Sequence, residues 1–281
     1  FVIGAVIVGI GTSLPELVVS TVGAIGGNSE VAIGNVVGSN IFNVFAILGL
    51  TALFFPIAVS RENMKFEIPF CIAVSALLML LVYNFFVGGE PRLGRWDGAA
   101  LLVFTSFMWI SLRRGKNSAA TVGESVEEEN KSLWFAAFSI LGGLAALIVS
   151  SNFFVDEAVA IARKLGVSDA FISITLLACG TSLPELAASV TAAVKKDTDM
   201  ALGNIIGSNI FNATMILGTA SLITPLTTGK IGLVDYGAMI LAAVLPMIFG
   251  IRGKITRIEG LLMLLCYAAY TWYIVTYVMA V

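Results

Sequence analysis

Two polar blocks occur twice in this chain, and both recur at one spacing. The block GTSLPEL starts at Gly11 and again at Gly180, while GNxxGSNIFN starts at Gly34 and again at Gly203. Each second copy follows the first by 169 residues, with no gap between the blocks. Chance similarity of apolar sequence does not place two polar blocks in register, so the pattern indicates an internal duplication. The chain must therefore fold as two related halves.

The blocks stand in an otherwise apolar chain. Of its 281 residues, 58% are hydrophobic and 12% are charged, whereas a soluble domain has about 45–50% apolar and about 25% charged residues. A net charge of −2 provides no basic surface for nucleic acid. We therefore predict an all-α polytopic membrane protein with nine spans. The spans are expected at 1–26, 30–55, 66–87, 96–112, 133–161, 170–194, 199–225, 231–250 and 258–280.

The duplication predicts how these spans are grouped. The second half begins near Leu133 with a span whose counterpart would start about 36 residues before Phe1, which is the length of one missing helix. Ten spans in the parent protein give five per half, and an odd number inserts the halves in opposite orientation, as in inverted-repeat transporters. We expect a first repeat at 1–112, a linker at 113–132 and a second repeat at 133–281, together forming one membrane domain with broken motif helices.

The placement of Lys and Arg predicts the orientation in the membrane. Eleven of the sixteen fall in loops on one predicted side (61–65, 113–131, 195–196 and 252–257), and five on the other. Positively charged loops stay in the cytoplasm. We therefore expect an inner or plasma membrane protein with a cytoplasmic linker at 113–132 and its C-terminus outside.

Two acidic residues, Glu16 and Glu185, lie inside apolar spans. A carboxylate at the membrane centre costs about 2.5–3.5 kcal/mol, so its default interpretation is functional. Each glutamate directly follows a proline, and proline interrupts the hydrogen bonds of a helix. A helix broken at mid-membrane frees backbone carbonyls, here around Thr12 and Thr181, which can coordinate cations.

Hydroxyl and amide side chains accompany both glutamates in the repeated blocks. In each second block a serine and the last asparagine are four residues apart, which puts them on one helix face. Asn40 and Asn209 point elsewhere and are expected to cap or bridge the backbone. Gly203 and Gly207, with their counterparts in the first half, form small-residue pairs that predict close contact between the motif helices. The hydroxyls and amides expected around the glutamates belong to Ser13, Ser39, Asn43, Ser182, Ser208 and Asn212.

These ligands are all oxygen atoms, and the chain has no histidine. Oxygen ligands favour hard cations, and Ca²⁺ takes 6–8 of them in a flexible shell. Two carboxylates neutralise one divalent ion, and Na⁺ can use the same oxygens, so the two ions exclude each other. No nucleophile–base pair, phosphate loop or cofactor motif accompanies the carboxylates, so we predict no enzyme activity and no cofactor.

The paired motifs GTSLPE and GNxxGSNIFN resemble the two alpha-repeats of the cation/calcium exchanger superfamily, in particular the prokaryotic sodium/calcium exchangers. The resemblance implies ten helices in two inverted repeats. It implies that Glu16 and Glu185 are the central Ca²⁺ and Na⁺ carboxylates, with Thr12 and Thr181 as carbonyl ligands of Ca²⁺. Some members carry Asp where this chain has Asn212, and in the potassium-dependent branch that Asp is tied to K⁺, so Asn implies potassium independence. The remaining implied ion-site residues are Ser13, Ser39, Asn43, Ser182, Ser208 and Asn212, with the carbonyls of Gly9 and Ala178 for Na⁺.

The function predicted from these residues is a secondary antiporter that exports Ca²⁺ in exchange for Na⁺ by alternating access. Its expected partners are the two ions and the lipid bilayer, with no nucleic acid and no obligate protein partner. Two other functions fit the same residues. One is an H⁺/Ca²⁺ exchanger, because a carboxylate in a low-dielectric site binds a proton readily. The other is a passive cation channel or a Ca²⁺-binding membrane module that does not transport.

Overall fold

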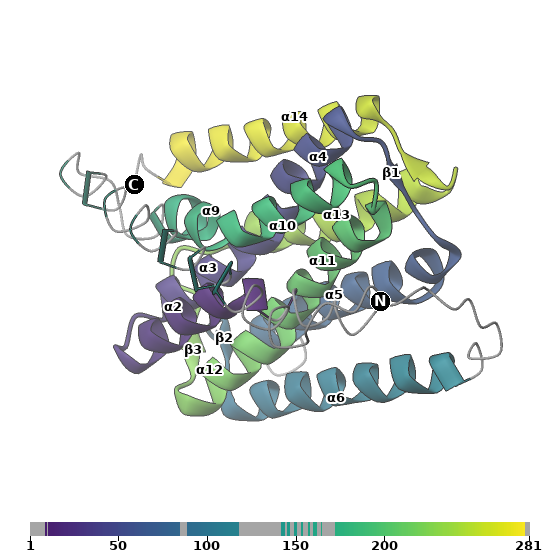
Figure 1. Ribbon diagram of the computed structural model, residues 1–281. Coiled ribbons are helices and arrows are strands. Elements are labelled where there is room, and N and C mark those ends of the chain that lie inside the picture. Colours follow the sequence, from purple (N-terminus) through teal and green to yellow (C-terminus); the bar gives the residue numbers. More distant parts are fainter. Residues whose placement is uncertain are drawn as a thin grey trace.

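A computed structural model describes residue 9, residues 11–84 and 89–117, scattered positions between 142 and 164, and residues 172–278. The fold is helical, as predicted (Figure 1). Within the described residues, five helices are long and apolar enough to cross a membrane, or six if one bent pair counts as a span. The five are Ser29–Phe54, Asn63–Tyr83, Thr198–Ile223, Leu233–Gly250 and Arg257–Thr276. Most of the predicted span at 133–161, and the linker from 118 to 132, lie outside the described residues.

The helices that carry the duplicated blocks have equal lengths in the two halves. Helix α2 (Leu14–Ile25) and helix α10 (Leu183–Val194) each have 12 residues. They are followed by α3 (Ser29–Phe42) and α11 (Thr198–Phe211), with 14 residues each. Both of these continue into π-helical segments that start at the last asparagine of the motif, η1 (Asn43–Leu48) and η4 (Asn212–Ile216). The repeat read from the polar blocks is thus also present in the backbone.

The rest of each half also follows one order. In the first half come α4 (Gly49–Phe54), β1 (Ile57–Ala58), η2 (Asn63–Glu67), α5 (Ile68–Tyr83), β2 (Arg92–Leu93) and α6 (Arg95–Asn117). The second half has η3 (Ser173–Leu177) and α9 (Ala178–Thr181) before α10. After η4 it has α12 (Leu217–Ile223), β3 (Leu226–Thr227), α13 (Leu233–Gly250), β4 (Lys254–Ile255), α14 (Arg257–Tyr273) and η5 (Ile274–Val278).

Short strands join the two halves, a feature that the apolar pattern does not predict. β1 pairs antiparallel with β4, with Ile57 opposite Ile255. β2 pairs antiparallel with β3, with Leu93 opposite Leu226. Each pairing satisfies backbone groups where the chain runs between helices. Each also ties a loop of one half to a loop of the other.

The last helix of each half packs against the other half through glycines. Helix α4 lies against α14, and helix α12 lies against α6. At the first contact a Cβ on Gly260 would stand 2.7 Å from the carbonyl oxygen of Gly49. At the second, a Cβ on Gly98 would stand 2.7 Å from the carbonyl oxygen of Gly218. Only glycine permits backbones to approach this closely.

The contact predicted for the motif glycines of the second half is wrong. Among the described residues, a Cβ on Gly203 or Gly207 would meet nothing within 4 Å. In the described residues the close approaches lie instead at the peripheral helices, where Gly49 and Gly98 meet backbone of the other half. A GxxxG spacing allows close contact but does not select which helix provides the partner.

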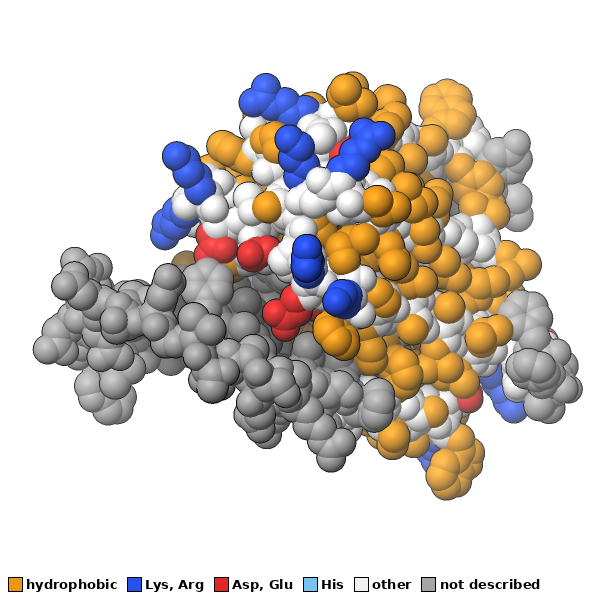
Figure 2. All heavy atoms as spheres, turned by 90° about the vertical axis from the view of Figure 1, so that its right-hand side faces the viewer, with side chains coloured by type: hydrophobic (Ala, Val, Ile, Leu, Met, Phe, Trp, Pro, Cys, Tyr) orange, Lys and Arg blue, Asp and Glu red, His pale blue; other side chains and the backbone are white. Residues whose placement is uncertain are grey.

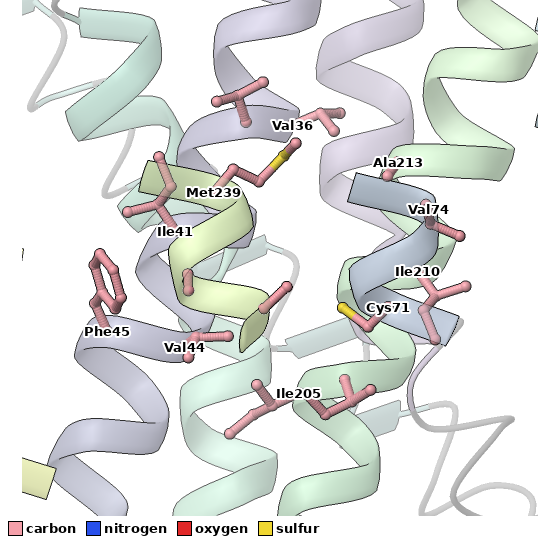
Figure 3. Close-up of a cluster of buried hydrophobic side chains, with 14 of the residues drawn as sticks. Val36, Ile41, Val44, Phe45, Cys71, Val74, Ile205, Ile210, Ala213 and Met239 are labelled. Atoms are coloured by element: carbon pink, nitrogen blue, oxygen red, sulfur yellow. The ribbon is translucent and has the colours of Figure 1, made fainter. Parts of the chain in front are cut away.

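Motif helices occupy the centre of the molecule. In the apolar windows, 78% of Ser29–Phe54 and 72% of Thr198–Ile223 are buried, against 22% of Arg257–Thr276. Figure 3 shows part of the packing around them, drawn from α3, η1, α5, α11, η4 and α13. Figure 2 shows hydrophobic side chains over much of the outer face, with most visible Lys and Arg toward its upper part. An apolar flank around a core with buried polar groups is the arrangement of a membrane protein.

Candidate cation-binding site

The two helices that carry the glutamates are broken, as predicted. Each break lies about one turn before its glutamate, at the start of α2 or α10. The second pair, Thr175–Thr181 and Leu183–Val194, is bent by 47°. In both halves the break falls at a serine, Ser13 or Ser182, with non-helical backbone angles. Both prolines then lie in the first turn of the next helix, where a missing N–H leaves no hydrogen bond unmade. The proline therefore starts the second half-helix, and the break itself lies two residues before it.

Each glutamate is held by the serine of the opposite half. Ser182 Oγ donates to Glu16 Oε1 at 2.9 Å, and Ser13 Oγ donates to Glu185 Oε1 at 2.9 Å. All four side chains are fully buried. Two such reciprocal bonds require both breaks to face each other. The structure thus brings together the two carboxylates that the sequence analysis placed at the centre.

Several buried side-chain oxygens near the two Ser–Glu bonds have no hydrogen-bond partner among the described residues. The second carboxylate oxygens of Glu16 and Glu185 have no hydrogen-bond partner in the described part of the chain. A buried carboxylate that lacks a partner is costly, because water no longer solvates its charge. Bound cations would remove this cost. The other buried oxygens in the same condition include Ser208 Oγ, Asn43 Oδ1, Asn212 Oδ1 and Asn204 Oδ1.

The half-helices before the breaks bring in hydroxyls and carbonyls. Thr12 Oγ donates to the carbonyl of Gly9 at 3.1 Å, and Thr181 Oγ donates to that of Ala178 at 3.4 Å. Ser39 from α3 reaches the same place, with its Oγ 3.4 Å from the Ala178 carbonyl and 3.4 Å from Thr181 Oγ. All twelve predicted site residues are buried.

The last asparagines of the motifs lie at the starts of the π-helical segments. Asn43 begins η1, which packs against α10, and Asn212 begins η4, which packs against α2. The π-helical segment that each asparagine begins therefore lies beside the glutamate helix of the other half. Their amide nitrogens bond to Asn209 and Asn40, which do bridge the backbone as predicted.

Sequence reasoning missed a pair of supporting asparagines. Asn35 Nδ2 donates to Ser20 Oγ at 3.1 Å and to the backbone carbonyl of Glu16 at 3.4 Å. Asn204 makes the equivalent bonds in the second half, at 3.0 and 3.4 Å. These bonds fix each glutamate helix to the motif helix that follows it. The available signal was the repeat itself, since Asn35 and Asn204 belong to the duplicated GN dipeptide.

The donor set fits a hard cation. Within the described residues no three His, Cys, Asp or Glu side chains converge, and the two carboxylates lie among neutral oxygens. Carboxylate, amide, hydroxyl and carbonyl oxygens are the ligands that Ca²⁺ takes. Free thiols at Cys71, Cys179 and Cys266 take no part in this oxygen set.

Comparison with known proteins finds relatives that match nearly the whole chain. The profile of the family described as "Sodium/calcium exchanger protein" matches residues 1–112 and 135–276. The chain is 37% identical to the putative antiporter CaxA of Alkalimonas amylolytica, covering 96% of this chain and 86% of the relative. It is 34% identical to the sodium/calcium exchanger MaX1 of Methanosarcina acetivorans, covering 96% and 87%.

A solved structure agrees over nearly the same length. The sodium-calcium exchanger NCX_Mj, soaked with 10 mM Na⁺ and zero Ca²⁺, superposes with a TM-score of 0.78 at 34% sequence identity. The match covers 96% of this chain and 85% of that chain.

Proposed function

Because this chain belongs to the sodium/calcium exchanger family, we propose that it exports Ca²⁺ in exchange for Na⁺, with Glu16 and Glu185 as shared cation ligands. Family membership confirms the resemblance drawn from the two motifs and the expectation that the chain is no enzyme. It makes the chain a multi-pass membrane protein of cation/calcium exchange. The observation that supports the glutamate site is the pair of crossed Ser–Glu hydrogen bonds, beside which one oxygen of each buried carboxylate has no hydrogen-bond partner among the described residues.

Charge balance favours a divalent cargo. Two carboxylates carry two negative charges, and a Ca²⁺ ion between them restores neutrality in a buried site where an uncompensated charge is costly. Two or more Na⁺ ions placed against the same oxygens achieve a similar balance. Ca²⁺ and Na⁺ therefore compete for Glu16 and Glu185, and release of one accompanies binding of the other.

The neutral ligands complete the shell around this pair. We assign Thr12 and Thr181 as carbonyl ligands next to the breaks. The carbonyls of Gly9 and Ala178 already accept hydrogen bonds from a threonine hydroxyl and from the backbone N–H of Ser13 or Ser182, so a Na⁺ ion bound there has to replace one of these donors. The surrounding side-chain ligands are Ser13, Ser39, Asn43, Ser182, Ser208 and Asn212.

Voltage supports the direction of export. Each elementary charge that crosses 100 mV is worth about 2.3 kcal/mol. If more than two Na⁺ enter for each Ca²⁺ that leaves, net positive charge moves into the cell. An inside-negative membrane potential then favours export of Ca²⁺. We therefore place the protein in the inner or plasma membrane.

The strand pairs support the proposed sidedness and the inverted halves. β1 and β4, which pair, come from two loops predicted to be cytoplasmic. β2 and β3, which pair, come from two loops predicted to lie outside. The carboxylate of Glu30 also accepts from the backbone N–H of Lys230 at 2.9 Å, joining two further outer positions. A cytoplasmic linker at 113–132 follows from the same assignment.

A second candidate is H⁺/Ca²⁺ exchange. A carboxylate oxygen without a hydrogen-bond partner can carry a proton as well as contact a metal ion, and both glutamates have one. Protons would then replace Na⁺ at the same two groups. The two candidates share the Ca²⁺ site and differ only in the coupling ion.

Reconstituted ⁴⁵Ca²⁺ uptake into vesicles with imposed Na⁺, H⁺ or K⁺ gradients distinguishes these functions. We expect an outward Na⁺ gradient to drive uptake against the Ca²⁺ gradient, and neither a pH nor a K⁺ gradient to do so. Uptake driven by a pH gradient and indifferent to Na⁺ would replace the proposal with the proton exchanger. Flux that only ever runs down the Ca²⁺ gradient would indicate a channel.

A further inference from the structure

Asn40 and Asn209 form a symmetric brace between the two halves. Asn40 Nδ2 donates to the backbone carbonyl of Asn209 at 3.0 Å, and Asn209 Nδ2 donates to the backbone carbonyl of Asn40 at 3.0 Å. The two residues lie on α3 and α11 and are almost entirely buried. This brace joins the two motif helices near the starts of η1 and η4.

The backbone carbonyls determine which way each brace amide points. A carbonyl oxygen only accepts hydrogen bonds, so the atom that faces it must be the NH₂ nitrogen. The Oδ1 atoms of Asn40 and Asn209 therefore point to the opposite side of each amide group. There they face two more asparagine side chains.

Those neighbours are the last asparagines of the motifs. Asn212 Nδ2 donates to Asn40 Oδ1 at 3.2 Å, and Asn43 Nδ2 donates to Asn209 Oδ1 at 3.0 Å. Because the amide nitrogens of Asn212 and Asn43 make these bonds, their Oδ1 atoms point away from Asn40 and Asn209. Both outward oxygens, Asn43 Oδ1 and Asn212 Oδ1, are buried without a partner among the described residues.

We propose that Asn40 and Asn209 are positioning residues that orient the amides of Asn212 and Asn43, so that each presents its oxygen and not its NH₂ group to the cation. This inference rests on the proposed cation site. An amide can rotate to exchange its oxygen and nitrogen, and an NH₂ group directed at a cation repels it. The brace removes that freedom through two carbonyls that cannot act as donors.

The geometry makes the coupling specific to pairs. Asn40 orients Asn212, and Asn209 orients Asn43, so each partner lies on the other motif helix. Asn40 and Asn43 are closer in sequence, yet no hydrogen bond joins their side chains among those found in the described residues. A general loss of packing would not distinguish these pairs.

A double-mutant cycle tests this pairing. We expect Asn40→Leu and Asn212→Ala each to weaken Ca²⁺ binding about tenfold, and the double variant to be no weaker than Asn212→Ala alone. The matched control combines Asn40→Leu with Asn43→Ala, which are not paired. Its loss of Ca²⁺ affinity should equal the product of the two single-variant losses. The readouts are the KM for Ca²⁺ in ⁴⁵Ca²⁺ uptake, with the maximal rate retained, and the Ca²⁺-dependent rise in Tm of the purified full chain.

Multiplied losses in the Asn40/Asn212 combination would overturn the positioning role. If Asn40→Leu does not fold, the mirror cycle of Asn209→Leu with Asn43→Ala and the milder Asn40→Ser carry the same test. A wild-type chain that shows neither Na⁺-driven uptake nor a Ca²⁺-dependent Tm rise would overturn the cation site itself, and the positioning role with it. A wild-type chain that exchanges ions while the cycles multiply would overturn the positioning role alone.

Discussion

Asn35 and Ser39 of the first half have hydrogen-bond partners that their counterparts in the second half lack among the described residues. Asn35 Oδ1 accepts from Thr181 Oγ at 3.1 Å, whereas its counterpart Asn204 Oδ1 has no partner in the described residues. Ser39 Oγ contacts the carbonyl of Ala178, whereas its counterpart Ser208 Oγ also has none there. Helix α9 thus packs on α3 through polar contacts that the described residues of the first half do not repeat on α11.

This contrast teaches that one motif sequence supports two local arrangements. In one arrangement, Thr181 and Ser39 form hydrogen bonds between α9 and α3. In the other, the corresponding oxygens of Asn204 and Ser208 have no hydrogen-bond partner among the described residues. An antiporter that works by alternating access needs an element with two such arrangements.

The largest expected loss of Ca²⁺ transport comes from replacing the buried glutamate that each half contributes. Glu16→Gln and Glu185→Gln each remove one of the two buried charges, and we expect at least a hundredfold loss of Ca²⁺ transport from either. Uptake of ⁴⁵Ca²⁺ measures the loss, and Glu90→Gln, at an exposed position, is the matched control. A variant that keeps its Ca²⁺ affinity would show that its half does not supply a central ligand.

Next come the glycine contacts, which the two halves make alike. Gly98→Ala and Gly260→Ala push a methyl group into a backbone carbonyl 2.7 Å away, so each should destabilise the fold by about 1–3 kcal/mol. Thermal unfolding in detergent gives the difference. Gly237→Ala, whose methyl group meets nothing within 4 Å in the described part of the chain, should leave Tm almost unchanged. An equal loss of stability there would mean that the helix contacts are not responsible.

A smaller effect separates the supporting asparagines. Asn35→Ala removes the acceptor for Thr181 as well as two donated bonds, whereas Asn204→Ala removes two donated bonds. We expect Asn35→Ala to cost about 1 kcal/mol more in the absence of cations. Equal Tm values for the two variants would contradict the asymmetry between the halves.

The smallest expected effect separates the two serines. Ser39→Ala removes the hydrogen bond from Ser39 to the carbonyl of Ala178. We expect the free energy of unfolding without cations to fall by about 0.5–1.5 kcal/mol, and Tm to fall slightly with it. Ser208→Ala should leave the cation-free Tm unchanged and weaken only Ca²⁺ binding. Titration calorimetry with Ca²⁺ beside thermal unfolding separates these responses, and a lowered cation-free Tm for Ser208→Ala would count against the distinction.

Much of the fold and of the site follows from the duplicated polar blocks. The two glutamates, the breaks beside them and the shared face of Ser39 with Asn43 are all local consequences of residue type and spacing. Asn35 escaped notice because an asparagine whose role is to hold a neighbouring helix has no local signature. Its function depends on Ser20 and Thr181, which only the folded chain brings near.

Partner choice over long distances is the other part that the sequence does not reveal. The glycines of the motif offered a contact, but the close approaches lie at Gly49 with Gly260 and at Gly98 with Gly218. Likewise, the crossed bonds from Ser13 and Ser182 could not be read from spacing, because each serine is much nearer in sequence to the glutamate of its own half. Tertiary geometry decides between such equivalent candidates.

The glycine contacts of α6 and α14 have a consequence for any chain that carries only one half. Such a chain would leave the face of its last helix bare, because the surface that covers it belongs to the other half. It could complete its own packing only by trading that helix with a second copy of itself. The fold therefore preserves, within one polypeptide, the architecture of a helix-swapped dimer.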